Sequence, residues 1–126
     1  MNLRATLGVV AALALVAGCS FQNKYERDAQ SFTMAVIHND LGPVQNEIAP
    51  GINISRVQVA EWSDELSQQG KFESLKETTA DCPPAAHCFI VKFANSTYKE
   101  EMRLDDKGRI SAWRFHSIAA SAVPKT

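Results

Sequence analysis

Glu100, in the last third of the chain, has sequence neighbours that could make its carboxylate a general base. Glu100 stands at alternate positions with Tyr98 and Met102, so a strand would turn all three side chains the same way. If that side is apolar, Glu100 loses its water, its pKa rises, and it becomes able to act as a general base. The hydrogen-bond donor that would act beside this base is Tyr25, Tyr98 or His116.

A structural interpretation of Glu100 is the alternative, and we prefer it. Long acidic side chains are rarely buried without a partner. The carboxylate is therefore expected at the sheet rim, at a β-bulge, or paired with Arg or Lys of a neighbouring strand. The lone histidines His38 and His116 stand at element ends, where capping or solvent exposure is typical. Trp62 and Trp113 share spacings with apolar neighbours and are predicted to belong to the core.

The sequence contains no motif that would specify a reaction. It has no nucleophile elbow, phosphate-binding loop, zinc-binding helix or repeated metal-ligand spacing. The net charge of −1, without a tract of like charges, gives no nucleic-acid footprint. His87 beside Cys88 would need at least one further ligand to hold a metal. We therefore expect no metal, cofactor or nucleic-acid partner.

The first 18 residues have the organisation of an export signal. Arg4 precedes an apolar run over 7–17, which suits a signal-peptide core and is shorter than the roughly 20 residues that a bilayer span needs. The run closes on Val16-Ala17-Gly18-Cys19, which resembles a bacterial lipobox, with Val where Leu is commoner. An ordinary secretory signal with an incidental Cys19 is the alternative.

The lipobox resemblance implies that residues 1–18 are removed and that Cys19 becomes the first residue. Its sulfur would carry diacylglycerol and its amine a fatty acyl group such as palmitate, which together give stable membrane anchoring. Ser20 in the next position resembles lipoproteins sent to the outer membrane of a bacterium with two membranes, facing the periplasm. Residues 19–23 would form a short lipidated tether.

Two cysteines remain once lipid occupies Cys19. Cys82 and Cys88 have five residues between them, and the envelope is an oxidising compartment in which disulfides persist. A Cys82–Cys88 disulfide is the natural expectation, and its closed loop would contribute roughly 2 kcal/mol. The spacing is not Cys-x-x-Cys, so a thioredoxin-like role has no support.

Three helical segments are expected after the tether. An apolar stripe through Tyr25, Ala29, Phe32 and Val36 predicts a helix over 24–39. Pro43 suits the first position of a short second helix, and Ser55 suits the N-cap of a third that ends near Gln69. Gly70 is the expected stop, and the polar Asp64 and Glu65 are expected to face solvent.

Four strands with short connections follow. Period-two patterning predicts strands over 71–79, 87–94, 98–104 and 109–116, and Asp105 to Gly108 reads as a tight hairpin connection. In the last strand one side should carry Trp113 and Phe115, and the other Ile110 and Ala112. The alternating charges Lys99, Glu101 and Arg103 indicate a wet sheet face or one that meets a polar partner. The tail over 117–126 is expected to be loose.

The element order indicates one α+β domain over 24–116, with N-terminal helices packed on a curved four-stranded antiparallel meander. This order, the phrase from Gly70 to Leu75 and the hairpin from Asp105 to Ile110 resemble the nuclear-transport-factor-two-like superfamily, and within it small bacterial domains of unknown function. The resemblance implies a cystatin-like cone, a bent sheet around the first helix whose open end could be a pocket. That superfamily holds enzymes, ligand binders and interaction modules alike.

Two functions are consistent with these observations. The first is a non-catalytic binding or interaction module, anchored through Cys19, that holds a protein partner or a small apolar ligand in the envelope. The alternative is a small isomerase or lyase with Glu100 as base in the cone. A purely structural envelope component is a third interpretation.

Overall fold

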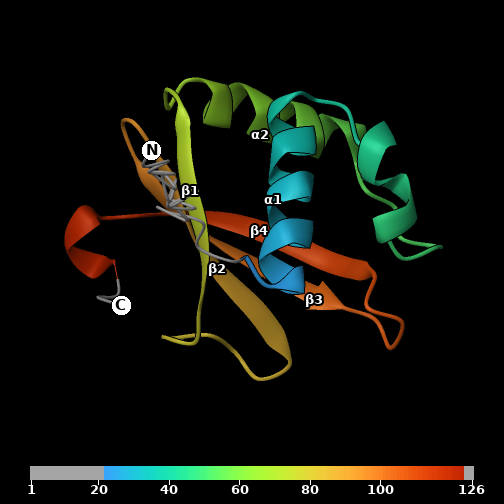
Figure 1. Ribbon diagram of the computed structural model, residues 1–126. Coiled ribbons are helices and arrows are strands. Elements are labelled where there is room, and N and C mark those ends of the chain that lie inside the picture. Colours follow the sequence, from blue (N-terminus) through green and yellow to red (C-terminus); the bar gives the residue numbers. More distant parts are fainter. Residues whose placement is uncertain (1–21, 124–126) are drawn as a thin grey trace, which may run out of the picture.

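The computed structural model describes residues 22–123. Three helical segments precede an antiparallel sheet whose strands lie in the order β1-β2-β3-β4, and a last helical turn follows it (Figure 1). This arrangement confirms the expected α+β class. The elements are α1 (Lys24–Ile37), η1 (Gly42–Glu47), α2 (Arg56–Ser67), β1 (Phe72–Thr78), β2 (Ala86–Phe93), β3 (Thr97–Leu104), β4 (Ile110–Ile118) and η2 (Ala120–Ala122). Cys19 and the expected signal segment lie outside the described residues.

The first helix begins at a capping box. The Asn23 side chain accepts a hydrogen bond from the Glu26 backbone, and the Glu26 carboxylate accepts one from the Asn23 backbone. Ala29, Phe32 and Val36 are buried, as the stripe predicted. Its fourth member differs, because Tyr25 is 40% exposed. The helix ends at Ile37, two residues before the expected end, where the chain turns through His38 and Asn39.

The connection to the sheet contains the two remaining helices. The expected second helix is a 3-10 helix, η1, that buries Val44. In α2 the Ser55 hydroxyl accepts from the Gln58 backbone, and the helix buries Val59 and Leu66. Gly70, at a φ of 81°, then takes the left-handed conformation that glycine adopts at low cost. Within residues 22–123, no helix combines the length and apolar character needed to cross a membrane.

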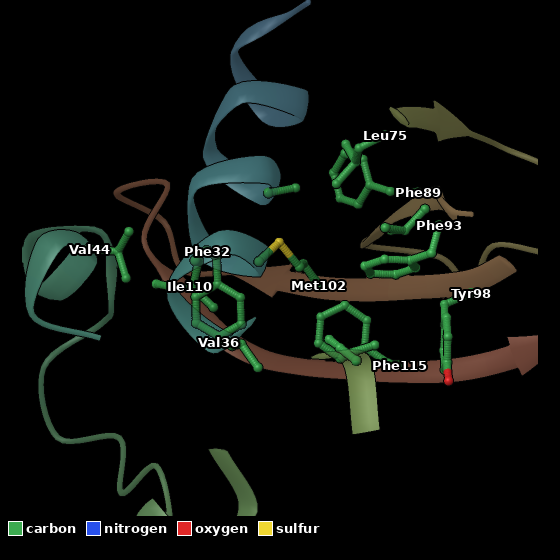
Figure 2. Packing of buried hydrophobic residues seen from close by; sticks show 14 of the residues in the cluster. Phe32, Val36, Val44, Leu75, Phe89, Phe93, Tyr98, Met102, Ile110 and Phe115 are labelled. Atoms are coloured by element: carbon green, nitrogen blue, oxygen red, sulfur yellow. The ribbon is translucent and has the colours of Figure 1, made fainter. Parts of the chain in front are cut away.

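The core lies between α1 and the sheet face that α1 covers, here called the inner face. It consists mainly of aromatic and aliphatic side chains from β2, β3 and β4 packed on Phe32 and Val36 (Figure 2). Trp62 and Trp113 are half-buried against this cluster. The predicted pattern of β4 is wrong at Ile110, which was placed on the side opposite Phe115. A register irregularity beside Leu104 turns Ile110 inward, so it is buried on the same face as Phe115.

The chain after residue 116 is more ordered than expected. β4 continues to Ile118, which pairs with Thr97 of β3, and η2 follows. At its other end β4 is flanked by a short parallel bridge between Ile110 and Ile48, where the Ala49 amide donates to the Ile110 carbonyl at 2.9 Å. The expected loose tail over 117–126 is therefore wrong for its first residues.

Candidate functional site

Glu100 lies in the middle of the inner face. On the neighbouring strands its partners in register are Phe89 of β2 and Phe115 of β4, and the carboxyl is fully buried among them. The Thr33 hydroxyl of α1 donates to Glu100 Oε2 at 2.7 Å. Glu100 Oε1 has no hydrogen-bond partner among the described residues. The carboxyl thus joins α1 to the sheet through a single hydrogen bond.

Burial raises the pKa of Glu100 to about 8, and the hydrogen bond from Thr33 opposes this rise. Within residues 22–123 no cation offsets the loss of water, so the neutral acid is the favoured form at neutral pH. The preferred sequence interpretation of Glu100 is therefore wrong. The residue is neither at the rim nor at a bulge nor paired with Arg or Lys, because strict strand alternation outweighs the usual exposure of acids.

The expected hydrogen-bond donors do not gather around Glu100. Tyr98 shares its face but donates to Glu65 Oε1 of α2 at 3.0 Å. Tyr25 stacks on His87 with 4.2 Å between ring centroids, and His116 is exposed on the outer face. Glu65 itself was predicted to face only solvent. Burial and this hydrogen bond from Tyr98 raise the tyrosine pKa.

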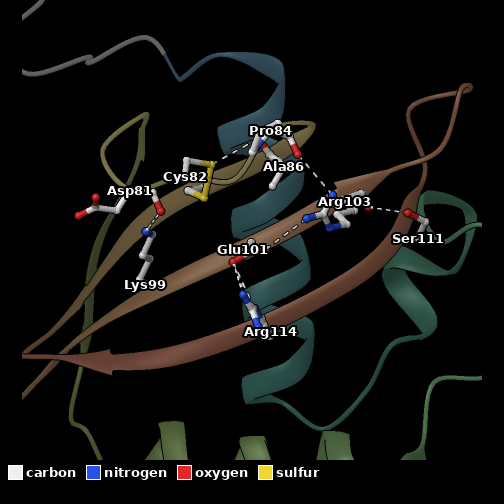
Figure 3. A network of polar contacts seen from close by, with 10 residues as sticks. Asp81, Cys82, Pro84, Ala86, Lys99, Glu101, Arg103, Ser111 and Arg114 are labelled. Atoms are coloured by element: carbon white, nitrogen blue, oxygen red, sulfur yellow. Dashed lines mark hydrogen bonds and ion pairs between the residues drawn. A yellow bond between two sulfur atoms is a disulfide. The ribbon is translucent and has the colours of Figure 1, made fainter.

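The outer face of the sheet holds a second carboxylate in a contrasting setting. Glu101 is 7% exposed, and its Oε2 accepts from Arg114 Nη2 at 2.8 Å and from Nε at 3.2 Å (Figure 3). Arg103 Nη2 lies 3.9 Å from the other oxygen. The hydrogen bond from Arg114, and the charges of both arginines, lower the pKa of Glu101. The face predicted to be solvated or to meet a polar partner is thus the outer face of the sheet, where the charged side chains pair with one another.

The β1–β2 connection, residues 79–85, folds onto the same outer face. We call it the hairpin loop. Cys82 and Cys88 form the expected disulfide, with Cα atoms 5.8 Å apart. Lys99 Nζ donates to the Asp81 carbonyl at 2.6 Å, and Arg103 Nη1 donates to the Pro84 carbonyl at 3.4 Å (Figure 3). Two of the three predicted charges on β3 therefore hold this loop.

A cleft of about 720 Å³ opens where the chain leaves α1, between η1 and the first turns of α2. Its lining mixes apolar side chains with Asp40 and Arg56, and at its edge Val57 is 67% exposed. The apolar lining includes Leu41, Ile48, Ile52, Ile54 and Val57. The sequence interpretation missed this cleft. Its signal was the set of isoleucines and valines over 48–59, of which Ile52, Ile54 and Val57 belonged to no predicted helical stripe.

Glu100 lines neither this cleft nor the two smaller ones that stand out on the described surface. Residues 22–123 also contain no group of three or more His, Cys, Asp or Glu side chains arranged to hold a metal. Comparisons of the chain with family models, with curated proteins and with solved structures gave no match.

Proposed function

We propose that the protein is a lipid-anchored binding module of the bacterial envelope, held at the outer membrane through Cys19 and facing the periplasm. The lipobox resemblance of Val16-Ala17-Gly18-Cys19 supports the anchor. The cleft between η1 and α2 supports the binding role, because a concave site lined by partly exposed apolar side chains beside polar groups is typical of ligand and partner sites.

The position of the cleft is the observation that carries this proposal. The tether joins α1 at Lys24, whereas the cleft begins at Asn39, just beyond the other end of the helix. A helix of 14 residues is about 21 Å long. A domain anchored at residue 19 would therefore hold the end of the cleft at Asn39 and Asp40 away from the lipid, where a periplasmic partner or a small apolar ligand could reach it, whereas the end at Ile48 lies nearer the tether.

The alternative proposal, an isomerase or lyase that uses Glu100, receives one favourable observation, the raised pKa of that carboxyl. A general base must also reach its substrate. Glu100 is fully enclosed, and among the residues that the structure describes it is hydrogen-bonded to Thr33 rather than to Tyr25, Tyr98 or His116. The binding module is therefore the better-supported function.

We also propose membership of the nuclear-transport-factor-two-like superfamily. Support comes from the meander order of the four strands and from α1 lying across one face of the sheet. The sequence phrases from Gly70 to Leu75 and from Asp105 to Ile110 add to it.

A matched pair of variants on α2 tests the binding role. Val57 lines the cleft, and its neighbour Gln58 is exposed but does not. Affinity-tagged protein is purified from detergent-solubilised envelopes of its host as wild type, Val57→Glu and Gln58→Glu. We expect a stoichiometric partner or ligand with the wild type and Gln58→Glu, and its loss with Val57→Glu. Equal recovery with all three, or bare protein from the wild type, would contradict the proposal.

The anchor is tested separately by intact-protein mass spectrometry. We expect Cys19 as the first residue with diacylglycerol and an acyl group attached, and we expect Cys19→Ala to abolish that modification. A cytosolic protein that retains residues 1–18 would contradict the lipoprotein assignment.

A further inference from the structure

The hairpin loop is held in one conformation by more contacts than a surface connection needs. The disulfide closes it, and β3 side chains bind its carbonyls from behind: Lys99 those of Ala80 and Asp81, and Arg103 that of Pro84. Asp81 and Ala85 are also fixed at φ values of 50° and 64°, which side-chain-bearing residues seldom adopt. The protein therefore stabilises one particular shape of this loop.

The loop lies beside the first turn of α1. Tyr25 stacks on His87, at the start of β2, with 4.2 Å between ring centroids. The Glu77 amide near the end of β1 donates to the Glu26 carboxylate at 2.9 Å. Both strands that flank the loop are thus joined to the turn at which the tether enters the domain. Figure 1 shows the loop between β1 and β2 at the same end of the molecule as the start of α1.

The tether is too short to separate this end of the domain from the membrane. Four residues lie between Cys19 and Lys24. Fully extended, they span about 14 Å. Once acyl chains fix Cys19 in the lipid, the start of α1 must stay within about that distance of the headgroups. The strand ends on either side of the loop, at Glu77 and His87, contact this turn and stay beside it.

We propose that the tip of the hairpin loop, residues 82–85, rests on the lipid surface and sets the orientation of the anchored domain. This inference rests on the proposed lipidation of Cys19. The tip has the chemistry for an interface of neutral headgroups, because its sequence is Cys-Pro-Pro-Ala and Pro84 and Ala85 are exposed. Within the tip, the Pro84 carbonyl accepts a hydrogen bond from Arg103 of β3, which lowers the cost of removing that carbonyl from water.

The other hairpin at this end of the sheet differs in chemistry. Residues 105–109 read Asp-Asp-Lys-Gly-Arg, so both signs of charge remain in water there. The hairpin loop has one charged side chain, Asp81, which precedes the tip. The uncharged segment of this end is therefore the tip of the hairpin loop.

The experiment uses the full lipidated protein, made in a bacterial host and verified by intact mass, in nanodiscs that contain nitroxide-labelled lipid. Amide NMR signals are compared with and without reduction of the nitroxide. We expect several-fold stronger broadening for the amides of Cys82 and of residues 85–88 than for Asn95 and Ser96 at the opposite end of the sheet, or for Ile52 to Arg56 at the cleft. Uniform broadening, or broadening strongest at the cleft, would overturn the proposal.

Two variants sharpen the result. A Gly/Ser insertion of about ten residues between positions 21 and 22 adds roughly 17 Å of reach and should leave the broadening of the tip in place if the tip binds lipid on its own. Replacing both Pro84 and Ala85 by Asp should weaken the broadening of the tip several-fold in the long-tether protein, with the fold checked by the unchanged amide spectrum.

If the long tether alone abolishes the broadening, the tip has no affinity for lipid and the proposal fails. Absence of acyl chains in the mass spectrum overturns the anchor and this inference together, whereas an acylated protein with uniform broadening overturns only the latter.

Discussion

Glu100 and Glu101 are neighbours on β3, yet the sheet places them in opposite electrostatic environments. Glu100 faces α1 and meets one hydroxyl, so burial raises its pKa to about 8. Glu101 faces outward and is also well covered, but Arg114 and Arg103 lower its pKa. Low exposure alone therefore does not decide the state of a carboxyl in this sheet. The presence of a cation on the same face does.

The contrast also separates the structural part of the domain from the parts for which we propose contact with other molecules. The inner face encloses Glu100 completely, whereas the cleft beside α2 and the hairpin loop on the outer face are open to solvent. Each carboxylate can be altered without touching the other, so the comparison can be tested residue by residue.

Replacing Glu100 by Gln should give the largest effect. The folded protein holds the Glu100 proton to about pH 8, while the unfolded chain releases it near 4.5, so the wild type loses stability as pH rises between these values. At about 1.4 kcal/mol per pKa unit, Glu100→Gln should be more stable than wild type by up to about 5 kcal/mol at pH 9, and by little at pH 5. Urea unfolding at both pH values measures the difference. The control Glu101→Gln should show no gain, and a gain of equal size in both variants would contradict the contrast.

Replacing Cys82 and Cys88 by Ser removes the covalent support of the outer face. Loss of the disulfide should lower the free energy of unfolding by roughly 2 kcal/mol, because the unfolded chain regains conformational entropy. The wild type under reducing conditions should show the same loss. The titration of Glu100 should not change, since the disulfide lies on the other side of the sheet; a shifted Glu100 midpoint would show that the two faces are coupled.

Replacing Thr33 by Val keeps the shape of the side chain and removes the hydroxyl that donates to the Glu100 carboxyl. We expect a loss of about 1.5 kcal/mol and a further rise of the Glu100 pKa, because this hydrogen bond lowers it. The loss should be greater at pH 9 than at pH 6. Thr33→Ser retains the hydroxyl and should keep the pKa of the wild type, so an equal shift in both variants would argue against the hydrogen bond as the cause.

Replacing Arg114 by Gln should have the smallest effect, about 0.5 kcal/mol, because Arg114 is largely exposed and its ion pair with Glu101 is screened by solvent. The lowered pKa of Glu101 means that this contribution is present above its ordinary pKa near 4.5 and is lost as pH falls through the lowered value. Thermal unfolding at pH 7 and pH 2.5, with and without 1 M salt, measures it. A difference that persists at pH 2.5 or in 1 M salt would point to packing rather than charge.

The element order could be predicted because it depends on local signals. Ser55 caps α2, Gly70 follows its end, and the alternation of Tyr98, Glu100 and Met102 gave their common face correctly. Alternation failed at Ile110, because a register irregularity between β3 and β4 is set by pairing with a neighbouring strand.

The surroundings of the candidate site could not be predicted in the same way. The partner of Glu100 is Thr33, 67 positions earlier, and the partner of Tyr98 is Glu65, which local patterning assigned to solvent. The cleft arises where η1, the connection that follows it and the first turns of α2 meet. Contacts of this kind depend on how helices lie over the sheet, which single-sequence patterning does not contain.

The titration of the Glu100 side chain tests the central claim most directly, namely that this carboxyl is a neutral core group and that recognition takes place on the surface. Selective ¹³C labelling of glutamate, with Glu100→Gln to assign the signal, gives its pKa by NMR. We predict a midpoint near 8, well separated from that of Glu101 below the ordinary value. A midpoint between 4 and 5 would mean that water or a cation reaches Glu100, and it would contradict this account.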